Sequence, residues 1–292
     1  MLKNANHKLI LGTVQFGLDY GINNTNGQVS LQDSHQILKY AFSQGIQILD
    51  SAEAYGNAHL VIGEFHKKNP DKLFEVITKL PHQLNSNIND KVNTYLSELH
   101  VTHLYALLFH SFSSYKENID YFDVLINLKN SGKIKYVGVS VYTNQEIEEV
   151  LLNDAVDIIQ LPFNLFDNIT QRGNILEKAK QKGKIIHTRS AFLQGLFFKD
   201  IHSKNDTVKS LQIELVEISK IAKNNKIPLA QLAINYCTQQ SLIDNVLIGV
   251  DSLNQLEQNI ESLKQKINAS LIDQINKIKV TEFHLLNPSL WN

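Results

Sequence analysis

Short runs of valine, isoleucine and leucine alternate with longer segments whose apolar residues recur at helical spacing, from one end of the chain to the other. Runs without polar alternation are typical of parallel strands that are buried on both faces and covered by helices. We therefore expect a parallel sheet with a helix after each strand. The predicted strands span residues 8–16, 45–51, 73–80, 103–110, 136–142, 157–163, 184–190 and 245–250.

Helices are predicted in the segments between these runs. Ser30, Thr143 and Ser252 each precede an Asp, Glu or Gln by three residues, which is the spacing of a helix-capping box. Glycines at 45, 132 and 183 stand where helices commonly end. The predicted helices lie near residues 31–44, 57–69, 88–100, 120–131, 144–153, 172–182, 208–224 with 229–240, and 253–265.

Eight strand–helix units in one chain of 292 residues favour a closed (β/α)8 barrel over an open doubly wound sheet, which usually has fewer strands. No Gly/Ser/Pro-rich linker interrupts the series, so residues 1–292 are predicted to form one domain with a tail at 281–292. Segments 111–120 and 190–206 are predicted to be long loops after strands, where barrels usually bind substrate.

Composition restricts the partners. The net charge is −1 with acidic and basic residues interleaved, which favours neither a nucleic acid nor a membrane surface as partner. The sequence has no signal-peptide-like start and no apolar run of membrane-spanning length. Cys237 is the only cysteine, so no internal disulfide is possible and the cytoplasm is the expected location.

Three polar residues stand where predicted strands end: Asp50, Lys79 and His110, with Tyr55 five residues beyond the first. Neighbouring parallel strands lie about 5 Å apart, so these four side chains are expected to meet. Asp50 can hold Lys79 charged, Lys79 is expected to lower the pKa of the Tyr55 phenol, and His110 can donate a hydrogen bond to a carbonyl. This is a plausible proton relay for carbonyl reduction, and it requires a nicotinamide cofactor as the hydride source.

Each of these residues also has an ordinary structural interpretation. A lone aspartate often caps a helix, a lone histidine is more often scaffold than catalyst, and Lys79 or Tyr55 alone would suggest surface or packing residues. Only their order at the ends of consecutive strands favours catalysis. No histidine or cysteine cluster has metal-ligand spacing, since His7, His59 and His187 lack partners, and no metal is expected.

At these residues the chain resembles the aldo-keto reductases, over about residues 11–260. The matching motifs occur in the family's order, and a collinear set is far more specific than any single motif. The resemblance implies a (β/α)8 barrel that transfers hydride between NAD(P)H and a carbonyl carbon. The motifs are LGTVQFG (11–17), DSAEAYG (50–56), ITKL (77–80), LLFHS (107–111), GVS (138–140), IIQLPFN (158–164), RSAFLQGL (189–196) and IGVDSLNQLEQN (248–259).

The resemblance also implies roles for individual residues. Tyr55 is implied as general acid in reduction and general base in oxidation, within a tetrad completed by Asp50, Lys79 and His110. A second group is implied to bind the cofactor: at the first strand, around the nicotinamide carboxamide, across the pyrophosphate and at the adenosine end. Its members are Gly12, Thr13, Ser140, Gln160, Arg189, Ser190, Phe192, Leu193, Gly195, Gly249, Ser252, Gln255 and Asn259.

Two positions depart from the family pattern. Arg189 stands where an aromatic residue commonly stacks on the nicotinamide, and a guanidinium there can stack or clamp a phosphate. The stretch 250–252 lacks the Lys or Arg that often meets the 2′-phosphate of NADP, and Asp251 would repel that phosphate. The family resemblance implies NADP(H) more than NAD(H), although the missing Lys or Arg and the presence of Asp251 favour NAD(H).

Two other functions remain compatible with the sequence: an NAD(P)H-binding redox sensor with little turnover, and a cofactor-free barrel isomerase or lyase. The start GTVQFGLDYGI followed by GQ is similar to a bacterial subgroup often associated with surface-polysaccharide or nonulosonic sugar pathways, which implies a sugar-derived carbonyl substrate. The resemblance implies a monomer. The tail with Trp291 is expected either to cover the pocket mouth or to pack on the outside of the barrel.

Overall fold

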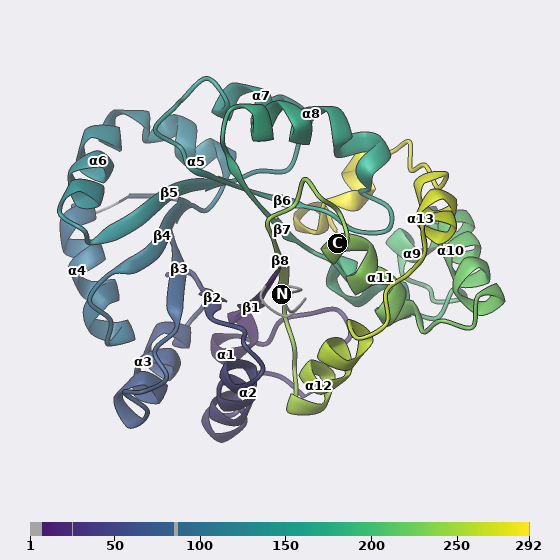
Figure 1. Ribbon diagram of the computed structural model, residues 1–292, viewed down its shortest axis with the longest axis horizontal. Helices are drawn as coiled ribbons and strands as arrows, with labels where there is room; N and C mark the ends of the chain where they lie inside the picture. The colour runs from purple at the N-terminus through teal and green to yellow at the C-terminus, as the bar shows by residue number, and fades with distance from the viewer. Residues whose placement is uncertain (1–7, 25, 85–86, 292) are drawn as a thin grey trace.

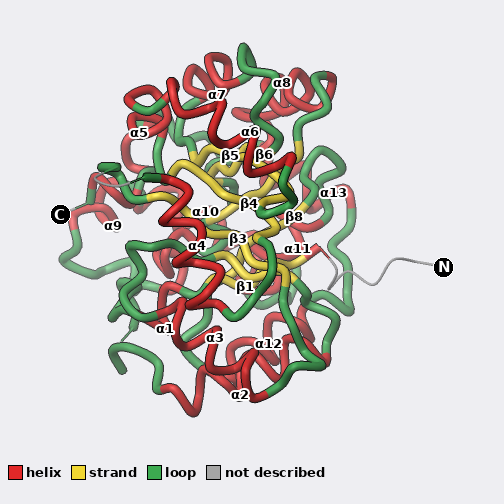
Figure 2. Tube along the Cα trace, turned by 90° about the vertical axis from the view of Figure 1, so that its left-hand side faces the viewer, coloured by secondary structure: helices red, strands yellow, loops and turns green. Residues whose placement is uncertain are grey.

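Eight parallel strands form a closed barrel in which each strand pairs with the next in chain order and β8 pairs with β1. This computed structural model describes residues 8–24, 26–84 and 87–291. Helices lie outside the strands (Figures 1 and 2), so the predicted (β/α)8 barrel is confirmed. The strands are β1 (Leu9–Gly12), β2 (Ile48–Asp50), β3 (Glu75–Leu80), β4 (Leu104–Phe109), β5 (Ile134–Ser140), β6 (Ile158–Pro162), β7 (Ile185–Arg189) and β8 (Asn245–Ile248).

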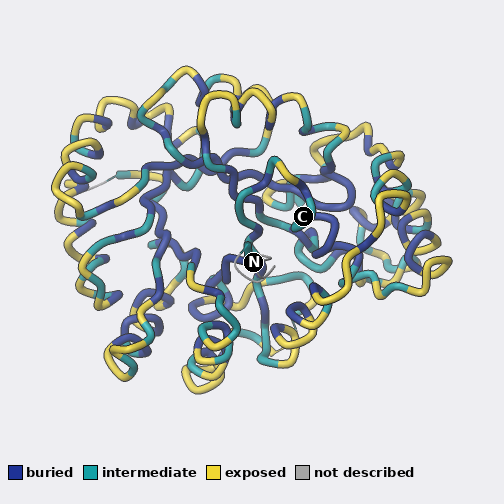
Figure 3. Tube along the Cα trace, in the orientation of Figure 1, coloured by how far each residue is buried: buried dark blue, intermediate teal, exposed yellow. Residues whose placement is uncertain are grey.

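The helices between the strands are amphipathic, and Figure 3 shows their buried sides toward the barrel and their exposed sides outward. The main helices are α2 (Leu31–Ser43), α3 (Ala58–Lys68), α4 (Ile88–Leu99), α6 (Phe122–Asn130), α7 (Asn144–Val150), α8 (Ile169–Gln181), α10 (Gln212–Asn224), α11 (Leu229–Thr238), α12 (Leu253–Ser262) and α13 (Ala269–Asn276). Shorter ones are α1 (Val14–Gly17), α5 (Phe112–Glu117), α9 (Asp206–Ser210) and the 3₁₀ turns η2 (Ile119–Tyr121), η3 (Leu193–Phe198), η4 (Phe283–Leu286) and η5 (Pro288–Leu290).

Two buried layers result from the continuous apolar runs. Alternate strand residues point into the barrel and form a small interior cluster, while the others pack outward against the helices in a much larger one. The interior is therefore a packed core and not a channel. The interior cluster consists of Ile10, Ile77, Ala106, Leu108 and Ile158.

The predicted helix starts are confirmed. The hydroxyl oxygens of Ser30, Thr143 and Ser252 each accept a hydrogen bond from the backbone N–H three residues later. Thr143 and Glu146 form the complete reciprocal capping box. Gly132 and Gly183 have φ angles of 73°, the left-handed conformation that commonly ends a helix.

Several predicted boundaries are wrong. The first strand ends at Gly12 instead of residue 16, because Thr13 turns the chain into the short helix α1. The predicted loop 111–120 contains α5, whose first turn is capped by the Ser111 side chain, and η2. The predicted loop 190–206 contains η3, in which Gln194 and Gly195 have positive φ angles.

Three helical segments also differ from the sequence prediction. Helix α8 begins at Ile169 because the Asn168 side chain caps it, three residues before the predicted start. The predicted helix 208–224 is divided at Leu211 into α9 and α10. Helix α13 was not predicted. No helix in the described ranges combines the length and apolar character needed to cross a bilayer.

Candidate active site

A cavity of about 610 Å³ opens at the carboxyl ends of the strands and is lined by all four residues predicted to form the relay. Asp50 is the last residue of β2, Lys79 lies near the end of β3, and His110 directly follows β4. The three strands are hydrogen-bonded neighbours, so parallel pairing brings their ends together. Tyr55 joins them from the turn between β2 and α3.

Asp50 and Lys79 form a buried ion pair, and each residue is only 2% exposed. The Lys79 ammonium donates to Asp50 and also to the backbone oxygen of Ser51, 3.1 Å away. The second carboxylate oxygen of Asp50 accepts a hydrogen bond from the Gln160 amide at 2.7 Å. The pair is thus held by contacts from three strands, as a buried charge pair requires.

Close backbone packing fixes the position of Tyr55. A Cβ on Gly17 would lie 1.8 Å from the backbone oxygen of Tyr55, so only glycine permits this contact between α1 and the Tyr55 turn. Gly56 has a φ of 54°, a left-handed conformation that favours glycine. The early end of the first strand therefore places α1 where it supports the candidate proton donor.

The Tyr55 ring lies close to both Lys79 and His110. Its centroid is 5.2 Å from the Lys79 ammonium nitrogen and 5.9 Å from the centroid of His110, which it meets edge to face. Burial is the largest effect on the Tyr55 phenol and raises its pKa, and the Asp50 carboxylate acts in the same direction. The prediction of a lowered Tyr55 pKa is therefore wrong, because burial and the Asp50 carboxylate both act to raise it. Tyr55 keeps its proton at ordinary pH.

His110 is neutral over the physiological pH range. Burial lowers the pKa of its imidazole to about 3, and the positive charges of Lys79 and Arg189 contribute. The ring of His82 stacks on it with centroids 4.7 Å apart, which restricts its orientation. A neutral imidazole carries one N–H, so His110 can donate one hydrogen bond to a group in the cavity.

The model of the Aldo/keto reductase family matches residues 8–280. The chain belongs to this family. It is 23% identical over 291 residues to the NADH-specific methylglyoxal reductase of Escherichia coli (strain K12), covering 85% of this chain and 87% of that protein. It is 24% identical over 248 residues to D-arabinose 1-dehydrogenase of Saccharomyces cerevisiae (76% and 73% covered).

Among solved structures, the chain is similar to the aldo-keto reductase AKR11C1 from Bacillus halodurans. The TM-score is 0.75, with 17% sequence identity and 94% of each chain covered. At this identity the likeness shows the shared fold alone. Family membership establishes an oxidoreductase of the aldo-keto reductase type, built on the same barrel.

Most residues that the family resemblance implies for the cofactor line the same cavity as the tetrad. Leu193 and Ser252 are the exceptions: Leu193 is fully buried in the core, and Ser252 caps α12. The implied residues that line the cavity are Gly12, Thr13, Ser140, Gln160, Arg189, Ser190, Phe192, Gly195, Gly249, Gln255 and Asn259.

Two glutamines in the cavity wall are suited to a nicotinamide dinucleotide. The side-chain oxygens of Gln15 and Gln160 are buried and have no hydrogen-bond partner within the described residues. Gly249 lies against Gln15, since a Cβ there would come within 2.8 Å of the Gln15 amide nitrogen. A carboxamide or ribose hydroxyl can satisfy such acceptors, so the family cofactor is compatible with these residues.

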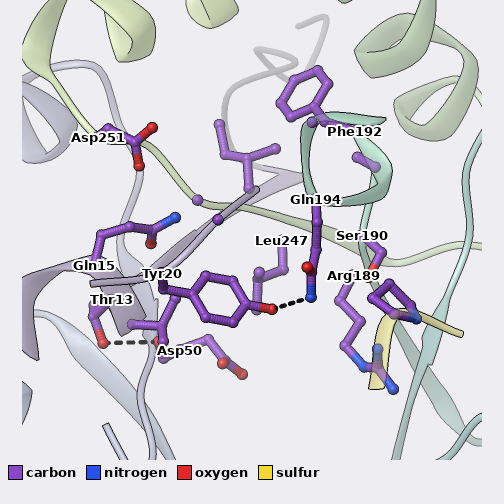
Figure 4. Close-up of a pocket in the computed structure, with 18 of the residues that line it drawn as sticks. Thr13, Gln15, Tyr20, Asp50, Arg189, Ser190, Phe192, Gln194, Leu247 and Asp251 are labelled. Carbon is purple, nitrogen blue, oxygen red and sulfur yellow. Dashed lines mark hydrogen bonds between the residues drawn. The ribbon is translucent and has the colours of Figure 1, made fainter. Parts of the chain in front are cut away.

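Several cavity residues were not predicted from the sequence. Tyr20 and Asn23 come from a loop and Gln194 from η3. Tyr142 lies two residues beyond Ser140, where it could have been assigned to the same strand face. Figure 4 shows Tyr20 and Gln194 pointing toward one another, and the Gln194 amide donates to the Tyr20 hydroxyl at 2.6 Å. Pro288 also lines the cavity, so the tail reaches it.

The other side chains considered for chemistry have structural partners. His59 bonds Glu98 and Thr78 at 3.1 and 2.8 Å, and Cys237 is buried in the core. The indole of Trp291 donates to the backbone oxygen of Leu285 at 3.0 Å. His7 lies outside the described residues. Within those residues, no group of three or more His, Cys, Asp or Glu side chains is arranged to hold a metal ion.

Acid should destabilise this barrel through its buried histidines. His187 is fully buried in the barrel, and burial lowers its pKa to about 4, as it does for His110. Below pH 6.5 these imidazoles take up protons in the unfolded chain but stay neutral in the folded chain. Their contribution to the free energy of unfolding is therefore fully present above pH 6.5. It is lost as the pH falls toward about 4 for His187 and about 3 for His110, at up to about 1.4 kcal/mol per pH unit for each group.

Urea unfolding at several pH values between 7.5 and 4.5 measures this slope. The variant His187→Leu should show a smaller loss of unfolding free energy across this range than the natural chain. Some slope should remain, because burial lowers the pKa values of His59 and His66 as well. Equal slopes for variant and natural chain would contradict the assignment of His187 as an acid-sensitive group.

Proposed function

We propose that this protein is an NAD(P)H-dependent reductase that converts an aldehyde or ketone to an alcohol, reversibly, with Tyr55 as the proton donor. One observation supports this most: a single cavity contains the buried Asp50–Lys79 pair, the Tyr55 phenol and the neutral His110 imidazole. A phenol that remains protonated can give its proton to the much more basic alkoxide that forms during reduction. We further propose that the protein acts as a cytoplasmic monomer.

Each side chain has a distinct task in this proposal. His110 donates its N–H to the carbonyl oxygen and so orients and polarises it. Tyr55 transfers the phenolic proton to that oxygen, and Lys79, held by Asp50, stabilises the resulting phenolate. Ser140 and Gln160 would hold the carboxamide of the cofactor, and Gly249, Gln255 and Asn259 its adenosine end. When bound, the nicotinamide supplies the hydride that no side chain can provide.

The choice between the two cofactors depends on Asp251. It lines the cavity, and its backbone N–H donates to the Gln255 side chain at 2.8 Å. The lining residues include no Lys or Arg besides Lys79 and Arg189 within the described chain, and Figure 4 shows Asp251 and Arg189 at opposite sides of the site. The preference for NADP(H) implied by the family stays a prediction, which this carboxylate opposes.

Replacing Asp251 with asparagine should therefore tighten NADPH binding about tenfold, because the carboxylate no longer repels the 2′-phosphate. NADH lacks that phosphate, so its dissociation constant should change by less than about threefold. Fluorescence titration of both nucleotides against both proteins measures these four constants. An equal change for NADH and NADPH would show that Asp251 does not face the 2′-position.

For the substrate we propose a sugar-derived carbonyl compound. Polar side chains at the cavity wall, including Asn23, Asn24 and Gln194, suit a hydroxylated ligand. The names of two relatives refer to methylglyoxal and D-arabinose, which are small oxygenated carbonyl compounds. Consumption of NADH and NADPH against a panel of aldoses, ketoses and simple aldehydes tests the proposal. Turnover of aromatic aldehydes alone would refute the sugar substrate, and tight nucleotide binding without any turnover would favour the redox sensor.

A further inference from the structure

The sequence contains only two arginines, and the structure uses them differently. Arg172 is buried and its guanidinium is occupied. It donates to both carboxylate oxygens of Asp167 at 2.6 and 2.7 Å, to Asn144 at 2.7 Å and to the backbone oxygen of Tyr142 at 2.6 Å. This arginine joins α8 to the segment after β5, and its role is structural.

Arg189 is the last residue of β7 and lines the cavity. Its guanidinium makes one long hydrogen bond, from Nη2 to the backbone oxygen of Val141 at 3.3 Å. No acidic side chain lies within ion-pair distance of it among the described residues. The Asp50 carboxylate of the same cavity is occupied by Lys79 and Gln160. The cavity thus contains an arginine charge without a counter-ion.

This guanidinium lies over an aromatic ring. Its central carbon lies 4.2 Å from the centroid of the Tyr142 ring, on which it stacks. Stacking uses the flat face and leaves the in-plane N–H groups available. Within the described chain, Nε and Nη1 have no hydrogen-bond partner. Nη2 retains a second N–H, which can pair with Nε, as in Arg172 on Asp167, or with Nη1 to hold two oxygens of one carboxylate or phosphate group.

The position of Arg189 is at the catalytic end of the cavity. His187 pairs with Gln160 across the sheet, and Arg189, two residues further on, lies on the same strand face one step nearer the mouth. Its charge reaches Tyr55, Lys79 and His110, where it opposes the burial-raised pKa of Tyr55 and contributes to the lowered pKa values of Lys79 and His110. Figure 4 shows Asp251, at the predicted adenosine end, across the site from Arg189.

We propose that Arg189 binds an anionic group of the carbonyl substrate, so that the enzyme acts on carbonyl compounds bearing a carboxylate or a phosphate. This inference rests on the proposed reductase function and adds the class of substrate. The Tyr142 ring is then a positioning residue that holds the guanidinium plane toward the incoming anion.

Two matched substrate pairs test the proposal: succinic semialdehyde against methyl 4-oxobutanoate, and glyceraldehyde 3-phosphate against glyceraldehyde. We expect a higher kcat/KM for the anionic member of at least one pair. The preference ratio is the kcat/KM of the anionic member divided by that of its neutral partner. In Arg189→Met this ratio should fall about 10- to 100-fold, the effect of losing hydrogen bonds to a charged group. Arg189→Lys keeps the charge without the planar fork, so its ratio should be intermediate. The pair with the larger fall identifies the anion.

Lys135→Met is the matched control. Lys135 is also a cation stacked on a tyrosine, 5.1 Å from the Tyr136 ring centroid, but it lies near the start of β5 and outside the cavity lining. The Lys135→Met variant removes one positive charge, as Arg189→Met does. If the preference ratio falls as much in Lys135→Met, the effect is one of net charge and the proposal is overturned. A ratio that stays constant in Arg189→Met would also overturn it.

A binding measurement separates this inference from the reductase function. In the presence of NADPH, 4-hydroxybutanoate should bind the natural chain more tightly than 1,4-butanediol by calorimetry, and Arg189→Met should remove the difference. The same measurement is made with glycerol 3-phosphate against glycerol. Equal binding within both pairs by the natural chain would overturn the proposal even if carbonyl reduction is observed. If Arg189→Met instead weakens NADPH binding and leaves the preference between the compounds intact, the arginine serves the nucleotide and the proposal is overturned.

Discussion

Replacing Tyr55 with phenylalanine is expected to lower kcat by about 10²–10⁴-fold, the usual contribution of a positioned general acid. The variant keeps the aromatic ring that lies close to both Lys79 and His110, so the packing of the cavity should persist. Only the proton that neutralises the forming alkoxide is removed. Steady-state reduction of several aldehydes measures the loss, and titration with NADPH checks that the nucleotide site is intact.

Tyr105→Phe provides a control with the same chemical change. Tyr105 lies on β4 inside the barrel, near His187, and does not line the cavity. Its removal of a hydroxyl should leave kcat within about threefold of the natural chain. Unimpaired turnover by the Tyr55 variant across all aldehydes would refute the proton-donor role.

Replacing Lys79 with methionine should both stop catalysis and destabilise the fold. Asp50 would remain buried with only the Gln160 amide as side-chain partner. Removing one partner of a buried ion pair typically costs about 3–5 kcal/mol, because the remaining charge is uncompensated. Urea unfolding at pH 7.5 measures this cost, and the same preparation should show a fall in kcat of about 10²-fold or more.

The double variant Asp50→Leu with Lys79→Met distinguishes stability from catalysis. It buries no uncompensated charge, so it should recover most of the unfolding free energy lost in the single variant. Activity should not recover, because the Lys79 ammonium that stabilises the Tyr55 phenolate is absent. A double variant as unstable as Lys79→Met would contradict the uncompensated-charge explanation, and one with restored turnover would exclude the pair from the mechanism.

The barrel could be predicted because its strands are buried on both faces. That burial requires continuous apolar runs, such as LYALLF in β4, and the interior and outer layers of the structure account for both sets of side chains. The errors occur where tertiary contacts decide the backbone. The first strand ends at Gly12 because α1 packs on the Tyr55 turn through Gly17, a contact that local sequence does not encode.

The meeting of Asp50, Lys79 and His110 also followed from the sequence, since the ends of neighbouring parallel strands must lie together. The direction of the Tyr55 pKa shift could not be predicted from the sequence. It depends on burial and on the charges around the phenol, and both require coordinates. Tyr20 and Gln194 were missed because a loop and a short 3₁₀ turn have no apolar periodicity, and their hydrogen bond joins segments 174 residues apart.

The most direct test of the account is the fate of an isotopic label. The protein is incubated with an aldehyde of the panel and with NADPH or NADH carrying two deuterium atoms at C4, and the alcohol is analysed by mass spectrometry and NMR. We predict one deuterium on the carbinol carbon, formed at a rate that falls about 10²-fold or more in the Tyr55→Phe variant. An alcohol without deuterium, or labelled alcohol formed at the same rate by this variant, would contradict the proposed reduction at this cavity.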